Sequence, residues 1–189
     1  MAEVLLFHHA QGRTPGVVAF ADDLRAAGHT VHTPDLYDGK TFDTVEEGVA
    51  HAREVGFDTL LDNGVAVADD LPAELVYAGF SLGGMPAQKL AQTRPGARGA
   101  LLFHVALPLA VFGGSWPESV PLQIHFMEDD PWAEEDLPAA REIVRTVDGA
   151  ELYLYPGDRH LFADRSVADY DADSAALLKQ RTLALLDAV

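Results

Sequence analysis

The sequence predicts an α/β fold of three layers, in which an open and mostly parallel six-stranded sheet carries helices on both faces. Short apolar runs alternate along the chain with longer segments of helical periodicity, which is typical of parallel βαβ units. Hydrophobic residues make up 48% and charged residues 23% of the chain, the composition of an ordinary globular protein. The 189 residues contain no repeat or low-complexity segment, so we expect a single domain over residues 1–189.

The six predicted strands are short apolar runs that end at glycine, proline or polar residues. The first strand ends in the glycine-containing loop Ala10–Gly12, and the second stops at Pro34. The third leads into the glycine-rich segment Gly79–Gly84, and the fourth into an apolar loop over residues 105–119. In chain order, the strands are expected over residues 3–8, 29–33, 74–78, 97–104, 121–127 and 151–155.

The first predicted helices carry clear end signals. Thr14 followed by Pro15 is typical of an N-cap and a first helical position, and Gly28 is a suitable residue to end that helix. Thr44 and Glu47 have the spacing of a capping box, so a second helix is expected to begin there.

Glycine and proline also delimit the later helices. We expect either Gly56 or the pair Asn63–Gly64 to divide the segment after the capping box into two helices. The helix after Gly84 should end before Pro95. The last two predicted helices, the final one rich in leucine, cover residues 137–147 and 172–188.

The charge balance excludes several classes of partner. The chain has 30 Asp and Glu against 13 Lys and Arg, a net charge of −17, which repels phosphate backbones and anionic lipid surfaces. We therefore expect no nucleic-acid and no membrane partner. The first apolar stretch, Val4–Phe7, is too short for a signal peptide or a membrane span, so a cytoplasmic location is the default expectation.

The absence of cysteine restricts the chemistry. The chain contains no cysteine, which excludes disulfides, thiolate metal sites and a cysteine nucleophile. Covalent chemistry must use another side chain. Ser81 is the candidate, because it is the central residue of a G-x-S-x-G pattern over Gly79–Gly83, between a predicted strand and a predicted helix. A sharp strand-to-helix turn would expose its hydroxyl, and the flanking glycines permit the close backbone approach that this turn needs.

A serine hydroxyl needs a base, and the base needs a carboxylate that orients it. In α/β-hydrolases these residues follow in the order serine, acid, histidine. His160 is the only histidine after the fifth predicted strand, and it lies in the loop beyond the sixth. The loop after the fifth strand offers Glu128, Asp129 and Asp130, and we favour Asp130 over Asp129 as the acid.

These segments together resemble the dienelactone hydrolase family, small α/β-hydrolases without a lid domain. The resemblance spans essentially the whole chain and rests on residues 8–12, 79–84, 126–131, 155–157, 160–162 and 170–175. It implies a triad of Ser81, Asp130 and His160. It also implies an oxyanion hole formed by the backbone N–H groups of Leu82 and Ala10.

The sequence departs from this family at three positions. The best-known members have cysteine where Ser81 stands, glutamate where His9 stands, and an arginine where Asp164 stands. In those members the arginine holds a substrate carboxylate. The resemblance therefore implies a serine hydrolase of small esters or lactones, a carboxylesterase or lactonase, but not of dienelactone itself. The alternatives are an acyltransferase or thioesterase on the same triad, and a non-catalytic binding module that keeps the fold.

Further residues have both a functional and a structural interpretation. His9 and His104 could line the substrate pocket or pack with their ring N–H groups bonded to backbone. Phe42 and Trp116 could form an apolar pocket or close the core. The histidines near strand ends lack metal-ligand spacing, so no metal and no cofactor are expected. The expected partner is a small-molecule ester or lactone, bound by a monomer or homodimer in a shallow pocket.

Overall fold

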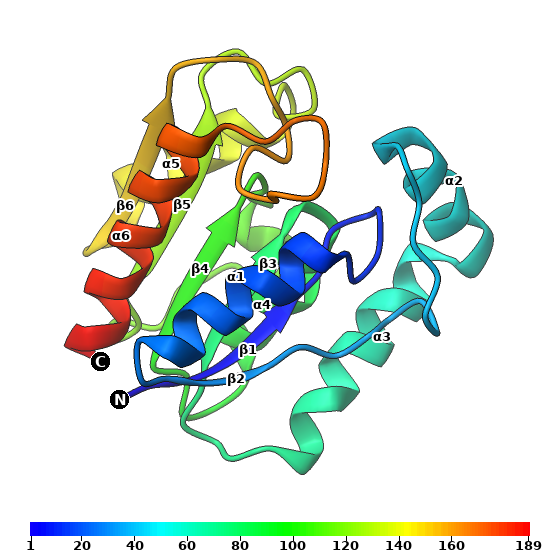
Figure 1. Cartoon of the computed structure of the whole chain (residues 1–189). Coiled ribbons are helices and arrows are strands. Elements are labelled where there is room, and N and C mark those ends of the chain that lie inside the picture. The colour runs from blue at the N-terminus through cyan, green and yellow to red at the C-terminus, as the bar shows by residue number, and fades with distance from the viewer.

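All six strands of the sheet are parallel in the computed structural model, which describes residues 1–189 (Figure 1). The strand order is β2-β1-β3-β4-β5-β6. The strands are β1 (Glu3–Phe7), β2 (Thr30–His32), β3 (Val76–Phe80), β4 (Gly99–Phe103), β5 (Leu122–Met127) and β6 (Ala150–Tyr155). In register, Val4 of β1 lies opposite Val76 of β3, and Phe80 lies opposite Phe103 of β4. The predicted six-stranded α/β architecture is confirmed.

Helices cover both faces of this sheet, as predicted. They are α1 (Pro15–Ala26), α2 (Val45–Val55), α3 (Phe57–Val67), α4 (Gly84–Thr93), α5 (Asp136–Thr146) and α6 (Ala172–Ala188). Helices α1 and α6 lie on one face, and α4 and α5 pack on the other (Figure 1). Gly56, with φ of 95°, divides α2 from α3, whereas Asn63–Gly64 lies inside α3. No lid domain is inserted between these elements.

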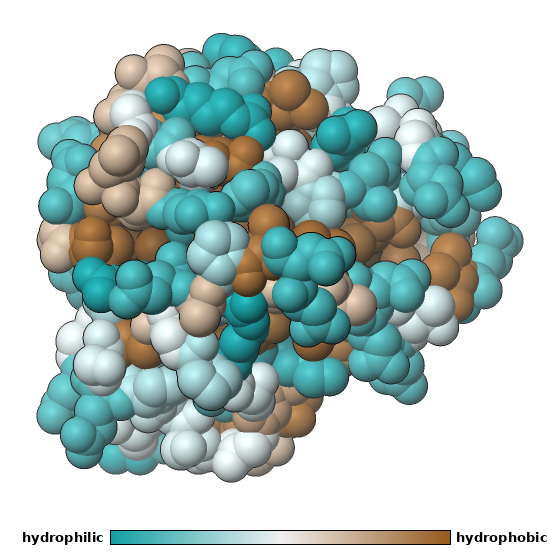
Figure 2. Space-filling model, turned by 90° about the horizontal axis from the view of Figure 1, so that it is seen from below, coloured by the Kyte–Doolittle hydropathy of each residue, from teal (hydrophilic) through white to brown (hydrophobic).

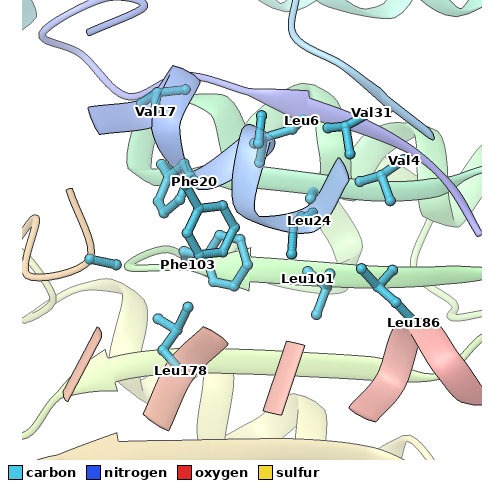
Figure 3. Packing of buried hydrophobic residues seen from close by; sticks show 14 of the residues in the cluster. Val4, Leu6, Val17, Phe20, Leu24, Val31, Leu101, Phe103, Leu178 and Leu186 are labelled. Carbon is cyan, nitrogen blue, oxygen red and sulfur yellow. The ribbon is translucent and has the colours of Figure 1, made fainter. Parts of the chain in front are cut away.

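The sheet separates two hydrophobic clusters of similar size. On one face, Phe20 and Leu24 of α1 and Leu178 of α6 pack against Leu6 and Phe103 of the central strands (Figure 3). On the other face, residues of α4 and α5 cover the opposite side of the same strands. The central strands β1, β3, β4 and β5 are therefore buried on both faces, and this explains their nearly continuous apolar sequences.

One face of the outer surface is largely hydrophilic (Figure 2). On the face shown in Figure 2, hydrophobic residues form small patches among hydrophilic ones. None of the helices combines the length and the apolar character that a membrane crossing requires.

Buried histidines predict an acid-labile fold. His8 and His125 are both 0% exposed, and burial lowers the pKa of His8 from 6.5 to about 4 and that of His125 to about 3. In the unfolded chain both titrate near 6.5, so the unfolded state binds more protons as the pH falls below that value. The native state then loses stability with falling pH. Between about pH 7.5 and about pH 5, the two histidines should lower the free energy of unfolding by roughly 4 kcal/mol.

Urea unfolding at both pH values measures this loss. The variant His125→Gln removes one titrating histidine, so its loss of free energy should be smaller by about 2 kcal/mol. A wild-type free energy of unfolding that is equal at the two pH values would contradict the prediction.

Candidate active site

Ser81 occupies a sharp turn between β3 and α4. It has φ of 47°, in the left-handed region that residues other than glycine rarely adopt. In this tight turn, the backbone at Gly79 lies against the carbonyl oxygen of Gly83. A Cβ on Gly79 would therefore not fit. A Cβ on Gly83 would in turn lie 2.6 Å from the carbonyl oxygen of His8. The two glycines of the motif thus allow a strained serine to sit at the carboxyl edge of the sheet.

The structure brings three predicted site residues into one hydrogen-bonded chain. The Oγ of Ser81 lies 2.8 Å from Nε2 of His160, and Nδ1 of His160 lies 2.7 Å from Oδ2 of Asp130. The side chains of His160 and Asp130 are only 4% and 0% exposed, so water competes little for this bond. Because a carboxylate only accepts hydrogen bonds, the proton of a neutral imidazole resides on Nδ1 and leaves Nε2 to accept from the serine.

Asp130 is oriented by its own loop, and Asp129 is not. The second oxygen of Asp130, Oδ1, accepts a hydrogen bond of 2.9 Å from the backbone N–H of Trp132. Asp129 is exposed, and its backbone N–H donates to the carbonyl of Gly157. Of the acidic residues in this loop, the structure therefore places Asp130 against His160.

Ala10 lies in the loop after β1 and presents a free backbone donor. The N–H groups of Gln11 and Gly12 both donate to His9, one to Nδ1 and one to the carbonyl oxygen. The N–H of Ala10 donates to no group of the protein, although the residue is buried. Leu82, the other predicted donor, directly follows Ser81 and packs against the small buried cluster of Tyr37, Ala52 and Leu60.

The two histidines predicted to line a pocket are both buried. His9 is 0% exposed and His104 is 1% exposed, so the pocket interpretation is corrected. Both follow central strands and lie beneath the segment after His160, whose Phe162 ring is 4.7 Å from that of His104. Neither ring donates an N–H group to the backbone as expected, and the one ring-to-backbone bond is accepted by His9 Nδ1 from the Gln11 N–H. His9 Nε2 lies 2.7 Å from the Asp164 carboxylate, and neither nitrogen of His104 has a partner.

Burial and the neighbouring histidines also set the charge state of His104. Burial, followed by the proximity of His160 and His125, lowers the pKa of His104 well below 6.5. The ring is therefore neutral beside His160, at 5.7 Å between centroids. The histidines near strand ends, which are His8, His9, His104 and His125, do not gather into a cluster of metal ligands.

The two predicted aromatic pocket residues have different surroundings. Phe42 is half-buried and packs on the rings of Tyr37 and His51, against the same small cluster as Leu82. Trp116 is buried in the core on the α5 face, and its Nε1 donates to the carbonyl of Val120. The surface hollow that Trp116 lines is formed with α5 and does not include Ser81, so Trp116 closes the core.

Trp132 is an aromatic residue at the site that sequence reasoning missed. Its side chain is 42% exposed, and its ring centroid lies 5.9 Å from that of His160. The available signal was its position, two residues after Asp130. Its exposed ring beside His160 offers an apolar contact surface.

The parallel sheet, its strand order and the serine turn after β3 define the protein as an α/β-hydrolase. Its residues 2–189 match the dienelactone hydrolase family. The chain belongs to that family, which confirms the resemblance stated above, and the protein is a hydrolase. A search of curated proteins finds no match.

Solved structures show the same fold at low sequence identity. A dienelactone hydrolase from Anabaena variabilis is 20% identical with a TM-score of 0.68, over 98% of this chain and 87% of that chain. A dienelactone hydrolase-like promiscuous phosphotriesterase from metagenomic libraries is 19% identical with a TM-score of 0.77, over 100% and 86%. The thioesterase domain from the curacin biosynthetic pathway is 16% identical with a TM-score of 0.65, over 96% and 90%.

Proposed function

We propose that the protein is a serine hydrolase that cleaves small carboxylic esters or lactones through an acyl-enzyme. The observation that carries this proposal is the continuous hydrogen-bonded chain from Ser81 through His160 to Asp130. A serine in a strained turn, a base within 2.8 Å of its hydroxyl and a buried acid on the far side of the imidazole are the three parts that nucleophilic catalysis requires.

In the proposed mechanism, Nε2 of His160 takes the Ser81 proton while Oγ attacks the carbonyl carbon. Asp130 holds the imidazole in the required tautomer and stabilises the imidazolium that forms. The carbonyl oxygen becomes an oxyanion that the N–H groups of Leu82 and Ala10 stabilise. His160 then protonates the leaving alcohol, and a water molecule activated by the same imidazole releases the acid.

The surroundings of Asp164 favour substrates without a carboxylate. Asp164 stands where the resemblance places a substrate-binding arginine, and it is 2% exposed and hydrogen-bonded to His9. His9 stands where the resemblance places a glutamate. Because these two residues bind each other inside the protein, they offer no cation to an anionic substrate. We therefore propose uncharged esters and lactones.

A panel of p-nitrophenyl esters and lactones tests the function, with matched neutral and carboxylated members. We expect hydrolysis of neutral members, and covalent labelling by a fluorophosphonate on the peptide that contains Ser81. Added alcohols and thiols separate hydrolysis from acyl transfer, and thioesters test the thioesterase alternative. A protein that neither turns over any member nor reacts with the fluorophosphonate would be a binding module, and the proposal would fail.

Trp132 should contribute to substrate binding rather than to the chemical step. Its ring lies at the rim of the site, 5.9 Å from the His160 ring, and it is absent from the proton path. Replacing Trp132 by alanine should raise KM for aryl esters by about 10-fold, the loss expected for one exposed aromatic contact, with kcat within about 3-fold. Steady-state kinetics measure both constants. Acetate esters of small alcohols are the control, because they are too small to contact the Trp132 ring.

A further inference from the structure

His9 uses both ring nitrogens, and its bonds assign its tautomer. Nδ1 accepts a hydrogen bond of 3.2 Å from the backbone N–H of Gln11, which can only donate. Nδ1 therefore carries no proton. The proton of the ring lies on Nε2, which is 2.7 Å from Oδ2 of Asp164 and donates to it. The arrangement needs a neutral imidazole in one tautomer.

Asp164 is held at the start of α1 by several donors. Its carboxylate accepts from Thr14 Oγ1 as well as from His9, and its other oxygen accepts from the backbone N–H and the hydroxyl of Ser166 at 2.8 and 2.7 Å. Burial by itself would raise the pKa of Asp164, but these hydrogen bonds and the electrostatic attraction of His9 lower it to about 2. Gly16 makes room for this carboxylate, because a Cβ there would collide with Oδ1.

The His9–Asp164 pair joins two loops of the candidate site that are 155 positions apart in the sequence. One is the loop after β1, where His9 immediately precedes Ala10. The other continues from His160, only four residues before Asp164. Within the first loop, His9 binds the N–H groups of Gln11 and Gly12, through its ring and its carbonyl. The pair therefore determines the path of the backbone whose free donor is Ala10.

We infer that His9 is a positioning residue for the oxyanion-binding loop, and that Asp164 selects the tautomer in which His9 can do this. The inference rests on the proposed function, in which the Ala10 N–H stabilises the oxyanion. His9 acts through the hydrogen bond that its Nδ1 accepts from the Gln11 N–H, two residues later in the chain. This bond closes a turn like the one that an asparagine side chain forms with the backbone N–H of the second residue after it. Asp164 acts through His9 and touches no reacting atom.

Two nearly isosteric variants isolate the bond to Gln11. His9→Asn and His9→Leu both lose the contact with Asp164, but only asparagine keeps an acceptor that can reach the Gln11 N–H. His9→Leu should lower kcat by on the order of 10²-fold with KM nearly unchanged, the effect of misplacing one oxyanion donor. His9→Asn should remain within about 5-fold of the wild type. Equal kcat values for the two variants would overturn the inference.

Asp164→Asn tests the tautomer. The groups around the Asp164 carboxylate all donate hydrogen bonds to it, whereas an asparagine amide would turn a donor NH₂ toward some of them. The hydrogen bond from His9 should therefore weaken, and kcat should fall by about 10-fold or more. Tyr155→Phe is the matched control, because it removes a different buried histidine bond, the 2.8 Å contact of the Tyr155 hydroxyl with His125. This control should reduce thermal stability without lowering kcat. A folded Asp164→Asn variant with wild-type kcat would contradict the role of Asp164.

Hydrogen exchange of the peptide over residues 8–14 gives a readout that needs no turnover. Its amides should exchange faster in His9→Leu than in His9→Asn and the wild type, and Tyr155→Phe should leave them unchanged. If the wild type shows no esterase activity, the proposed function fails while exchange still decides whether His9 orders the loop. Unchanged exchange in His9→Leu would overturn the inference even in an active enzyme.

Discussion

Replacement of Ser81 by alanine is expected to lower kcat on activated esters by on the order of 10⁴-fold or more, because no other side chain of the site can form the acyl-enzyme. Only the Oγ is removed. That atom makes one hydrogen bond, to Nε2 of His160, and Ser81 is only partly buried. The free energy of unfolding should therefore change by no more than about 1 kcal/mol. Steady-state kinetics and urea unfolding of the same preparation measure the two effects.

Ser81→Gly is the matched control for the backbone. It also lacks the nucleophile, but it can adopt the φ of 47° without strain. It should be equally inactive and about 1 kcal/mol more stable than the alanine variant. Substantial hydrolysis by either variant would show that the nucleophile lies elsewhere, and the proposed mechanism would be wrong.

Replacement of Asp130 by asparagine should reduce kcat by on the order of 10⁴-fold, because an amide at this position favours the wrong tautomer of the imidazole. Asp130 Oδ2 accepts from Nδ1 of His160, and Oδ1 accepts from the Trp132 N–H. An amide that keeps its oxygen on Trp132 turns its NH₂ toward His160. The imidazole then accepts at Nδ1, carries its proton on Nε2 and can no longer take the proton from Ser81.

Asp129→Asn is the neighbouring control for the same loop and the same change of charge. Asp129 is exposed, and its only backbone bond is to Gly157. Its substitution should leave kcat within about 2-fold of the wild type. If Asp129→Asn is the variant that loses activity, the acid of the proposed triad is assigned to the wrong residue.

Local patterns predicted the order of the helices and strands but not all of their bounds, since the third strand, expected over residues 74–78, is Val76–Phe80. The side chain of Thr14 accepts from the Val17 N–H, and that of Thr44 accepts from the Glu47 N–H, as their sequence context predicted. The βα alternation also predicted a mostly parallel sheet. These features depend on residues a few positions apart, which interact before any tertiary packing. Cytoplasmic location and a monomeric or dimeric state stay predictions.

The sequence by itself also determined which segments meet at the candidate site, because Ser81, the acidic loop and His160 each follow a parallel strand. The tertiary structure decided which side chains point inward: Asp130 rather than Asp129 reaches His160, Trp116 closes the core, and Trp132 flanks the site. It alone placed His9 against Asp164. The direction of a loop side chain depends on burial and on hydrogen bonds to distant segments, and no local periodicity encodes these contacts.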